Sequence, residues 1–70
     1  MTPEAAENLV MAHRYLYYVL SDSVISDAVY DQIEREARVI CPLRSPVHDV
    51  GSSLPSSYSQ QNTELALSLR

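Results

Sequence analysis

The stretch that decides the fold is residues 26–42, which read SDAVYDQIEREARVICP. Ser26 is a typical helix N-cap, and Asp27 follows it in the first turn, where a negative charge suits the helix dipole. Residues at three- and four-residue steps then mark one helix face: Tyr30, Ile33, Ala37 and Ile40. Pro42 disfavours a helical conformation in the residue before it, so we predict that the helix ends near Cys41.

A second helix is predicted before this one. Thr2 can cap a helix that starts at Pro3, because proline lacks an N–H group that would be unpaired there anyway. A stripe at helical period follows, made of Ala6, Leu9, His13, Leu16 and Leu20. The turn-forming residues 21–23 then end the helix, which we place over residues 3–20. The short link that follows favours an antiparallel hairpin with the two stripes facing each other.

Beyond Pro42 the helical period is lost. Residues 52–59 are rich in serine and are typical of a loop or tail. Leu65, Leu67 and Leu69 alternate with smaller residues, which predicts a short strand without a partner in this chain. The predicted fold is therefore all-α: an antiparallel helical hairpin with its following loop over residues 1–51, and a mostly irregular, flexible polar tail over residues 52–70.

Composition excludes several classes of protein. With 70 residues and a net charge of −4, the chain has room for one small core. Its single cysteine and two histidines argue against a disulfide or a zinc site, and its longest uncharged stretches are too short or too polar to span a membrane. An acidic N-terminus does not resemble a secretory signal, so we expect a cytoplasmic protein. Five arginines against nine acidic residues give no basic surface for direct nucleic acid binding.

The residues that could bind a ligand lie at one end of the predicted hairpin. Four of the five tyrosines and three aspartates lie near the link between the helices: Tyr15, Tyr17, Tyr18, Tyr30, Asp22, Asp27 and Asp31. Asp27 and Asp31 are four residues apart and share a helix face. Aromatic faces beside carboxylates attract a flat cationic ring, and carboxylates accept hydrogen bonds from ribose hydroxyls. A pyridinium ribonucleotide meets both descriptions.

A purely structural interpretation stands beside this one. Tyrosines at helical spacing also serve as partly buried packing residues, and Asp27 also serves as a partner of the helix dipole. His13 lies within the first apolar stripe, which is typical of a packed histidine, and Cys41 is typical of a small apolar residue at a helix end.

Residues 13–31, HRYLYYVLSDSVISDAVYD, resemble the N-terminal domain, called Ia, of bacterial NAD-dependent DNA ligases, whose pattern is close to H-x-Y-x-Y-Y-V-L-D-x-P-x-I-S-D-A-x-Y-D. Residues 45–51, SPVHDVG, resemble the next signature of that family, S-P-T-x-x-V-G. The resemblance implies a helical unit that recognises the nicotinamide mononucleotide (NMN) half of NAD. It also implies that the ligand-contacting positions are Tyr17, Tyr18, Asp27, Tyr30 and Asp31, with histidine in some members at the position of Tyr18.

The resemblance sets limits on activity as well. No lysine is present, so the chain cannot form the adenylated lysine of the ligase family, and we expect no catalysis from it alone. The expected function is weak binding of NMN or NAD. The alternatives are an interaction module that docks on a ligase catalytic domain in trans, with the alternating leucines added to a sheet edge, and a vestigial ligase fragment.

Overall fold

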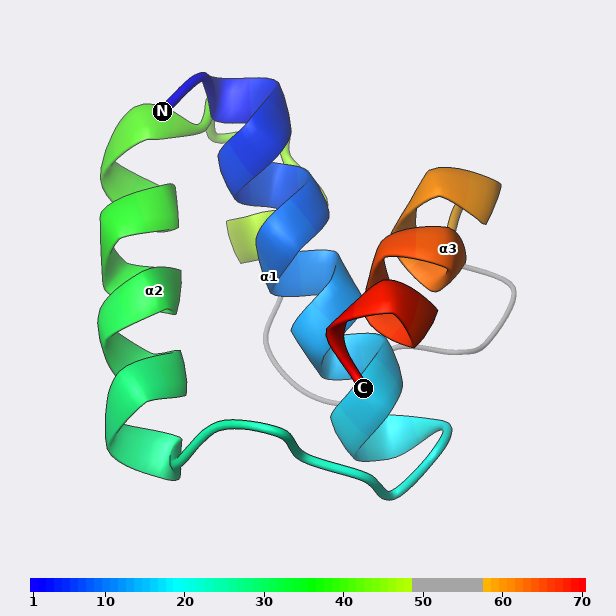
Figure 1. Ribbon diagram of the computed structural model, residues 1–70. Coiled ribbons are helices and arrows are strands. Elements are labelled where there is room, and N and C mark those ends of the chain that lie inside the picture. The colour runs from blue at the N-terminus through cyan, green and yellow to red at the C-terminus, as the bar shows by residue number, and fades with distance from the viewer. Residues whose placement is uncertain (49–57) are drawn as a thin grey trace.

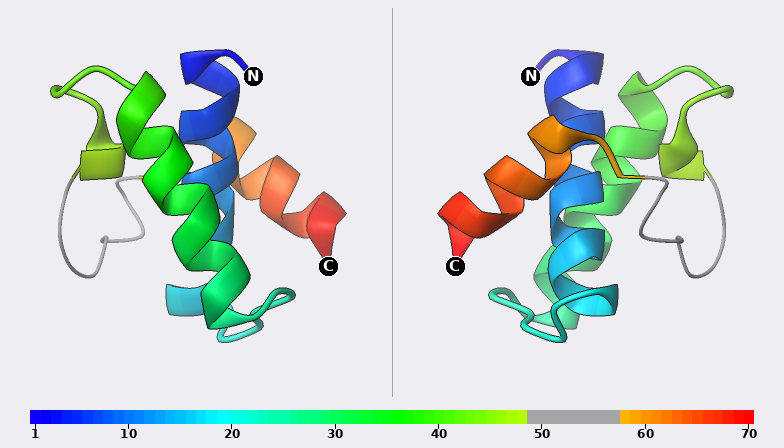
Figure 2. Two further views of the ribbon diagram at one scale, coloured as in Figure 1. Left: turned by 90° about the vertical axis from the view of Figure 1, so that its left-hand side faces the viewer. Right: turned by 90° about the vertical axis from the view of Figure 1, so that its right-hand side faces the viewer.

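The computed structural model describes residues 1–48 and 58–70, which form three α-helices and one short 3-10 helix: α1 (Pro3–Tyr18), α2 (Asp27–Ile40), η1 (Pro46–His48) and α3 (Gln60–Leu69). Helix α1 lies between α2 and α3, and α1 and α2 run antiparallel (Figure 1). Helix α3 packs at an inclination on the side of α1 away from α2 (Figure 2). The prediction of an all-α hairpin is confirmed.

The helix starts follow the predicted caps. The hydroxyl of Thr2 accepts a hydrogen bond from the Ala5 amide at 3.1 Å, and that of Ser26 accepts one from the Val29 amide at 3.3 Å. Helix α2 ends at Ile40, and Cys41 takes the extended conformation that a following proline favours. The first helix ends at Tyr18, two residues before the predicted end.

The early end of α1 follows from the turn that comes next. The Leu20 amide donates to the Tyr15 carbonyl at 3.2 Å, and the Asp22 amide donates to the Leu16 carbonyl at 2.8 Å. Between them Ser21 has a positive φ of 52°, the left-handed conformation that reverses the chain at a helix end. These two backbone hydrogen bonds close a tight turn at the end of α1. The turn directs the chain towards α2.

The core has two parts because α1 is covered on two sides. One cluster joins α1 to α2 and η1 and consists of Ala6, Val10, Ala37, Cys41 and Val47. The other joins α1 to α3 and consists of Ala12, Leu16 and Ala66. Leu16, which we predicted to face the second helix, packs in the cluster with α3. The interpretation of α1 as a helix with one buried stripe was therefore wrong.

The predicted strand near the C-terminus was also wrong, since residues 60–69 form α3. Ser59 and Asn62 make a capping box: the Asn62 amide donates to the Ser59 hydroxyl at 3.1 Å, and the Ser59 amide donates to the Asn62 side chain at 2.9 Å. Leu65 and Leu69 are four residues apart and both pack at the α1–α3 cluster, whereas Leu67 is 55% exposed. Within the alternating leucines, Leu65 and Leu69 are thus an i, i+4 pair on one face of a helix.

The rest of the predicted tail, residues 52–57, lies outside the described residues, as do the boundary placed between residues 51 and 52 and the end of the 45–51 motif. Among residues 1–48 and 58–70, each helix is too short or too polar to cross a membrane.

Replacement of Ala66 by Asp tests whether α3 is part of the fold. Ala66 is fully buried, so an unpaired carboxylate there should lower the free energy of unfolding by about 2 kcal/mol or more, a large share of the ~3–5 kcal/mol of a chain this small. The matched control is Leu67→Asp at the neighbouring exposed position, which should change stability little. Urea denaturation followed by circular dichroism measures the free energy of unfolding of each variant. Equal values for the two variants would contradict the packing of α3.

Candidate functional site

The hairpin end of the molecule contains a pocket of about 440 Å³. Its lining residues come from the end of α1, the link and the start of α2, and these segments lie at the foot of the view in Figure 1. All five residues singled out from the sequence line it: Tyr17, Tyr18, Asp27, Tyr30 and Asp31. The structure therefore brings the predicted residues together in one cavity. Its volume falls within the ~300–1,000 Å³ that is usual for small-molecule sites.

Two of the pocket tyrosines lie at the open rim. Tyr17 and Tyr18 are 54% and 47% exposed, and their rings meet edge to face with centroids 4.9 Å apart and an angle of 77° between the ring planes. Edge-to-face contact is a favourable arrangement of aromatic quadrupoles. It leaves aromatic surface available to a ligand, because each ring covers only part of the other.

The third tyrosine is held from behind. The hydroxyl of Tyr30 accepts a hydrogen bond from Nε of Arg14 at 3.1 Å. Burial raises the pKa of Tyr30 to about 12, and the hydrogen bond from Arg14 acts in the opposite direction by favouring the phenolate. The hydroxyl is therefore protonated at neutral pH, and Tyr30 presents a neutral aromatic ring to the pocket.

The two pocket carboxylates carry the negative charge of the site. Asp27 and Asp31 lie one turn apart at the exposed start of α2, and neither forms an ion pair within residues 1–48 and 58–70. Arg35, one turn further on, donates to the backbone carbonyl of Asp31 at 3.4 Å rather than to its carboxylate. By contrast, Asp22 pairs with Arg70 at 2.9 Å and does not line the pocket.

The structure adds pocket residues that we did not single out for binding: His13, Ser23, Ile25 and Ala28. His13 is buried, as expected of a packed histidine, and burial lowers its pKa, so the ring is neutral at pH 7. Its position one helical turn before Tyr17 could have indicated that it shares the pocket face. Ser23 and Ile25 lie in the link, joined by a 2.8 Å hydrogen bond, where no periodic signal could reveal them.

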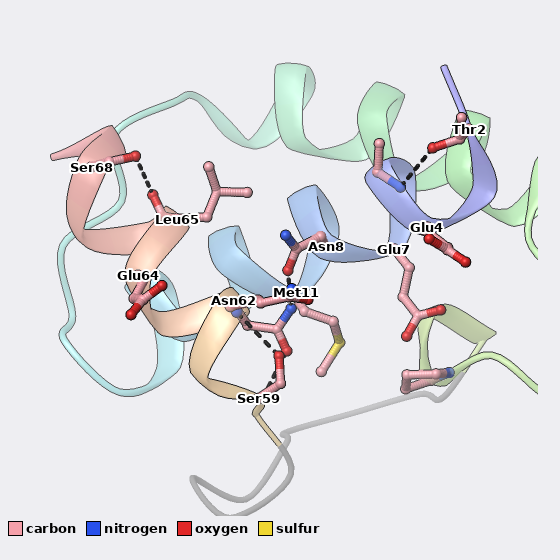
Figure 3. A pocket seen from close by; sticks show the side chains of 13 residues that line it. Thr2, Glu4, Glu7, Asn8, Met11, Ser59, Asn62, Glu64, Leu65 and Ser68 are labelled. Carbon is pink, nitrogen blue, oxygen red and sulfur yellow. Dashed lines mark hydrogen bonds between the residues drawn. The ribbon is translucent and has the colours of Figure 1, made fainter.

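A larger hollow of about 820 Å³ lies between the first half of α1 and α3 (Figure 3). Glu4, Glu7 and Glu64 line it, and Asn8 and Asn62 are hydrogen bonded to each other across it. Among the described residues that line it none is aromatic, so these residues offer no stacking surface for a flat ring. The sequence could not predict this hollow, since its far wall is α3.

The described residues that line the two cavities do not bring metal-ligating side chains together in a group that could hold an ion. Within the described part of the chain, no three histidine, cysteine or acidic side chains come close enough together to hold a metal ion.

Comparison with known proteins gives one informative match. The chain is 49% identical over 37 residues to a DNA ligase from Roseiflexus sp. (strain RS-1). The match covers 53% of this chain and 5% of the ligase. No protein-family model matches, and no solved structure matches. The chain is thus related in sequence to a DNA ligase over about half of its own length, and it spans only a small part of that relative.

The raised pKa of Tyr30 predicts a loss of stability in alkali. An unfolded tyrosine loses its proton near pH 10, whereas Tyr30 in the folded chain keeps it up to about pH 12. Within this window the folded state binds more protons, so the free energy of unfolding should fall as the pH rises.

Urea denaturation at steps across this window measures the effect. The Tyr30→Phe variant should show a shallower fall of the free energy of unfolding with pH than the wild type, because it lacks the hydroxyl whose pKa is raised. Equal slopes for the wild type and Tyr30→Phe would contradict the raised pKa.

Proposed function

We propose that this chain is a module similar to domain Ia of NAD-dependent DNA ligases and that it binds the NMN half of NAD in the pocket at the hairpin end. One observation carries the proposal: tyrosine rings and two carboxylates without ion-pair partners among the described residues line the same cavity. The sequence relation to a DNA ligase supports it.

The chemistry of the pocket suits the positively charged nicotinamide ring of oxidised NAD better than an uncharged aromatic ring. The oxidised ring is flat and positively charged, so it gains from the negative faces of Tyr17 and Tyr30. Asp27 and Asp31 add Coulomb attraction at the open side of the site. Their oxygens can also accept hydrogen bonds from ribose hydroxyls or from the carboxamide of the ligand.

The same geometry predicts weak binding. Tyr17 and Tyr18 are about half exposed, so a ligand against them keeps much of its own surface in water. Affinity for a small molecule depends on how much of it is removed from water and on how few groups must be ordered. We expect dissociation constants in the millimolar range and, because the sequence has no lysine, no adenylated lysine intermediate on this chain.

A cytoplasmic location is part of this proposal. Cys41 is a buried free thiol, which fits a reducing compartment.

Docking on a ligase catalytic domain in trans is still an alternative proposal, but one feature offered in its support is wrong. The alternating leucines Leu65, Leu67 and Leu69 lie in α3 and not in a strand that could extend the sheet of a partner. A vestigial fragment without binding activity is the competing hypothesis, and the experiment below separates the two.

A titration of the ¹⁵N-labelled protein with NMN, followed by NMR, tests the proposal. Shifts should cluster at Tyr17, Tyr18, Asp27, Tyr30 and Asp31, and AMP, which lacks the pyridinium ring, should not reproduce them. Asp31→Asn should weaken NMN binding about fivefold, the equivalent of ~1 kcal/mol for one partly screened charge pair.

Asp22→Asn is the matched control. It makes the same chemical change at the same end of the molecule, but on a carboxylate outside the pocket, so NMN binding should be retained. No shifts with millimolar NMN, or equal effects of the two substitutions, would overturn the proposal and favour the vestigial fragment.

A further inference from the structure

Arg14 is a residue of α1 that does not line the pocket. Its side chain is only 4% exposed, and a guanidinium buried this deeply is costly unless its N–H groups find acceptors. Nη1 donates to the Pro46 carbonyl and Nη2 to the Val47 carbonyl, each at 3.0 Å. Nε donates to the Tyr30 hydroxyl at 3.1 Å. The planar group therefore connects α1, α2 and η1.

The bond to Tyr30 bears directly on the pocket. A tyrosine side chain has two torsions, and a fixed hydroxyl at its far end restricts χ1, the torsion that sets where the ring lies; rotation of the ring about its own long axis leaves the oxygen in place. Tyr17 and Tyr18 are half exposed, whereas Tyr30 is partly buried with its hydroxyl bonded to a buried group. Tyr30 is thus the pocket tyrosine whose ring is held in place before any ligand arrives. A wall that is already ordered lowers the entropy lost on binding.

Charge balance makes this arrangement compatible with a cationic ligand. An uncompensated arginine behind the pocket would repel a pyridinium ring. The carboxylate of Glu34 lies 3.7 Å from Nη2 of Arg14, on the same helix as Tyr30, and compensates its charge. Asp27 and Asp31 then set the charge that the open side of the pocket presents.

We propose that Arg14 is a positioning residue for the pocket: it holds the ring of Tyr30 through the hydroxyl group and ties that ring to η1, without touching the ligand. The proposal rests on the proposed function for its effect on NMN, but the state of the Tyr30 ring in the free protein can be measured without a ligand.

The experiment compares Arg14→Lys, Tyr30→Phe and the double variant. Lysine keeps the charge but lacks the planar fork, so it cannot hold Tyr30 and η1 together. Carbon-13 relaxation of the aromatic rings in the free protein should show greater motion of the ring at position 30 in Arg14→Lys. NMN affinity should fall about two- to tenfold in each single variant, as expected for one side chain that must be ordered on binding.

The double variant separates positioning from general weakening of the fold. If Arg14 acts through the Tyr30 hydroxyl, the double variant should bind NMN about as well as the weaker single variant. Arg44→Lys, at an exposed position, and Tyr15→Phe are the matched controls and should change neither affinity nor ring motion at position 30. Additive losses of affinity, or unchanged ring motion in folded Arg14→Lys, would overturn the proposal.

Two further results have a definite meaning for the role of Arg14. If the wild type does not bind NMN, the proposed function fails, and ring motion in the free protein alone judges the role of Arg14. If Arg14→Lys does not fold, Tyr30→Phe takes its place: a more mobile ring at position 30 supports the proposal, and an equally rigid ring overturns it.

Discussion

The structure depends on one buried guanidinium. Arg14 projects from α1 into the space where α2 and η1 meet, and its hydrogen bonds reach Tyr30 and the carbonyl groups of Pro46 and Val47. A buried charge must find its partners or destabilise the fold by several kcal/mol. Because those partners come from two other segments, α2 and η1, one side chain of α1 fixes how the hairpin and η1 fit together. The apolar cluster around Val47 then closes over the same junction.

The pocket lies at the end of the hairpin, where Asp27 and Asp31 are exposed to water. The left-handed turn at Ser21 ends α1 and sends the link across to Ser26, so the last turn of one helix faces the first turn of the other. Polar and acidic side chains are tolerated there because water reaches them. The same openness sets the character of the site: it can attract a flat cation by its charge and its aromatic faces, but it leaves one side of that ligand in water.

Much of the hairpin could be predicted because the signals are local. A cap such as Thr2 or Ser26 satisfies amides within its own first turn, and Pro42 acts on the residue beside it. Asp27, Tyr30 and Asp31 were recognised together for the same reason, since residues three and four apart share a helix face in any α-helix. To place the tyrosines of α1 beside these residues, one further expectation is enough: a short link makes the two helices antiparallel, so the end of α1 lies near the start of α2.

The sequence by itself therefore determined the two hairpin helices, their caps and the residue types at the hairpin end, because these follow from interactions between near neighbours. Only the tertiary structure decided that Leu16 packs with α3 rather than α2, that Leu65 and Leu69 belong to a helix, and that Arg14 is buried. A short segment of alternating apolar residues, such as residues 65–69, is compatible with a strand and with a helix. Which of the two forms depends on the element that packs against one of its faces. An arginine is ordinarily exposed, and only acceptors brought from distant parts of the chain make its burial stable.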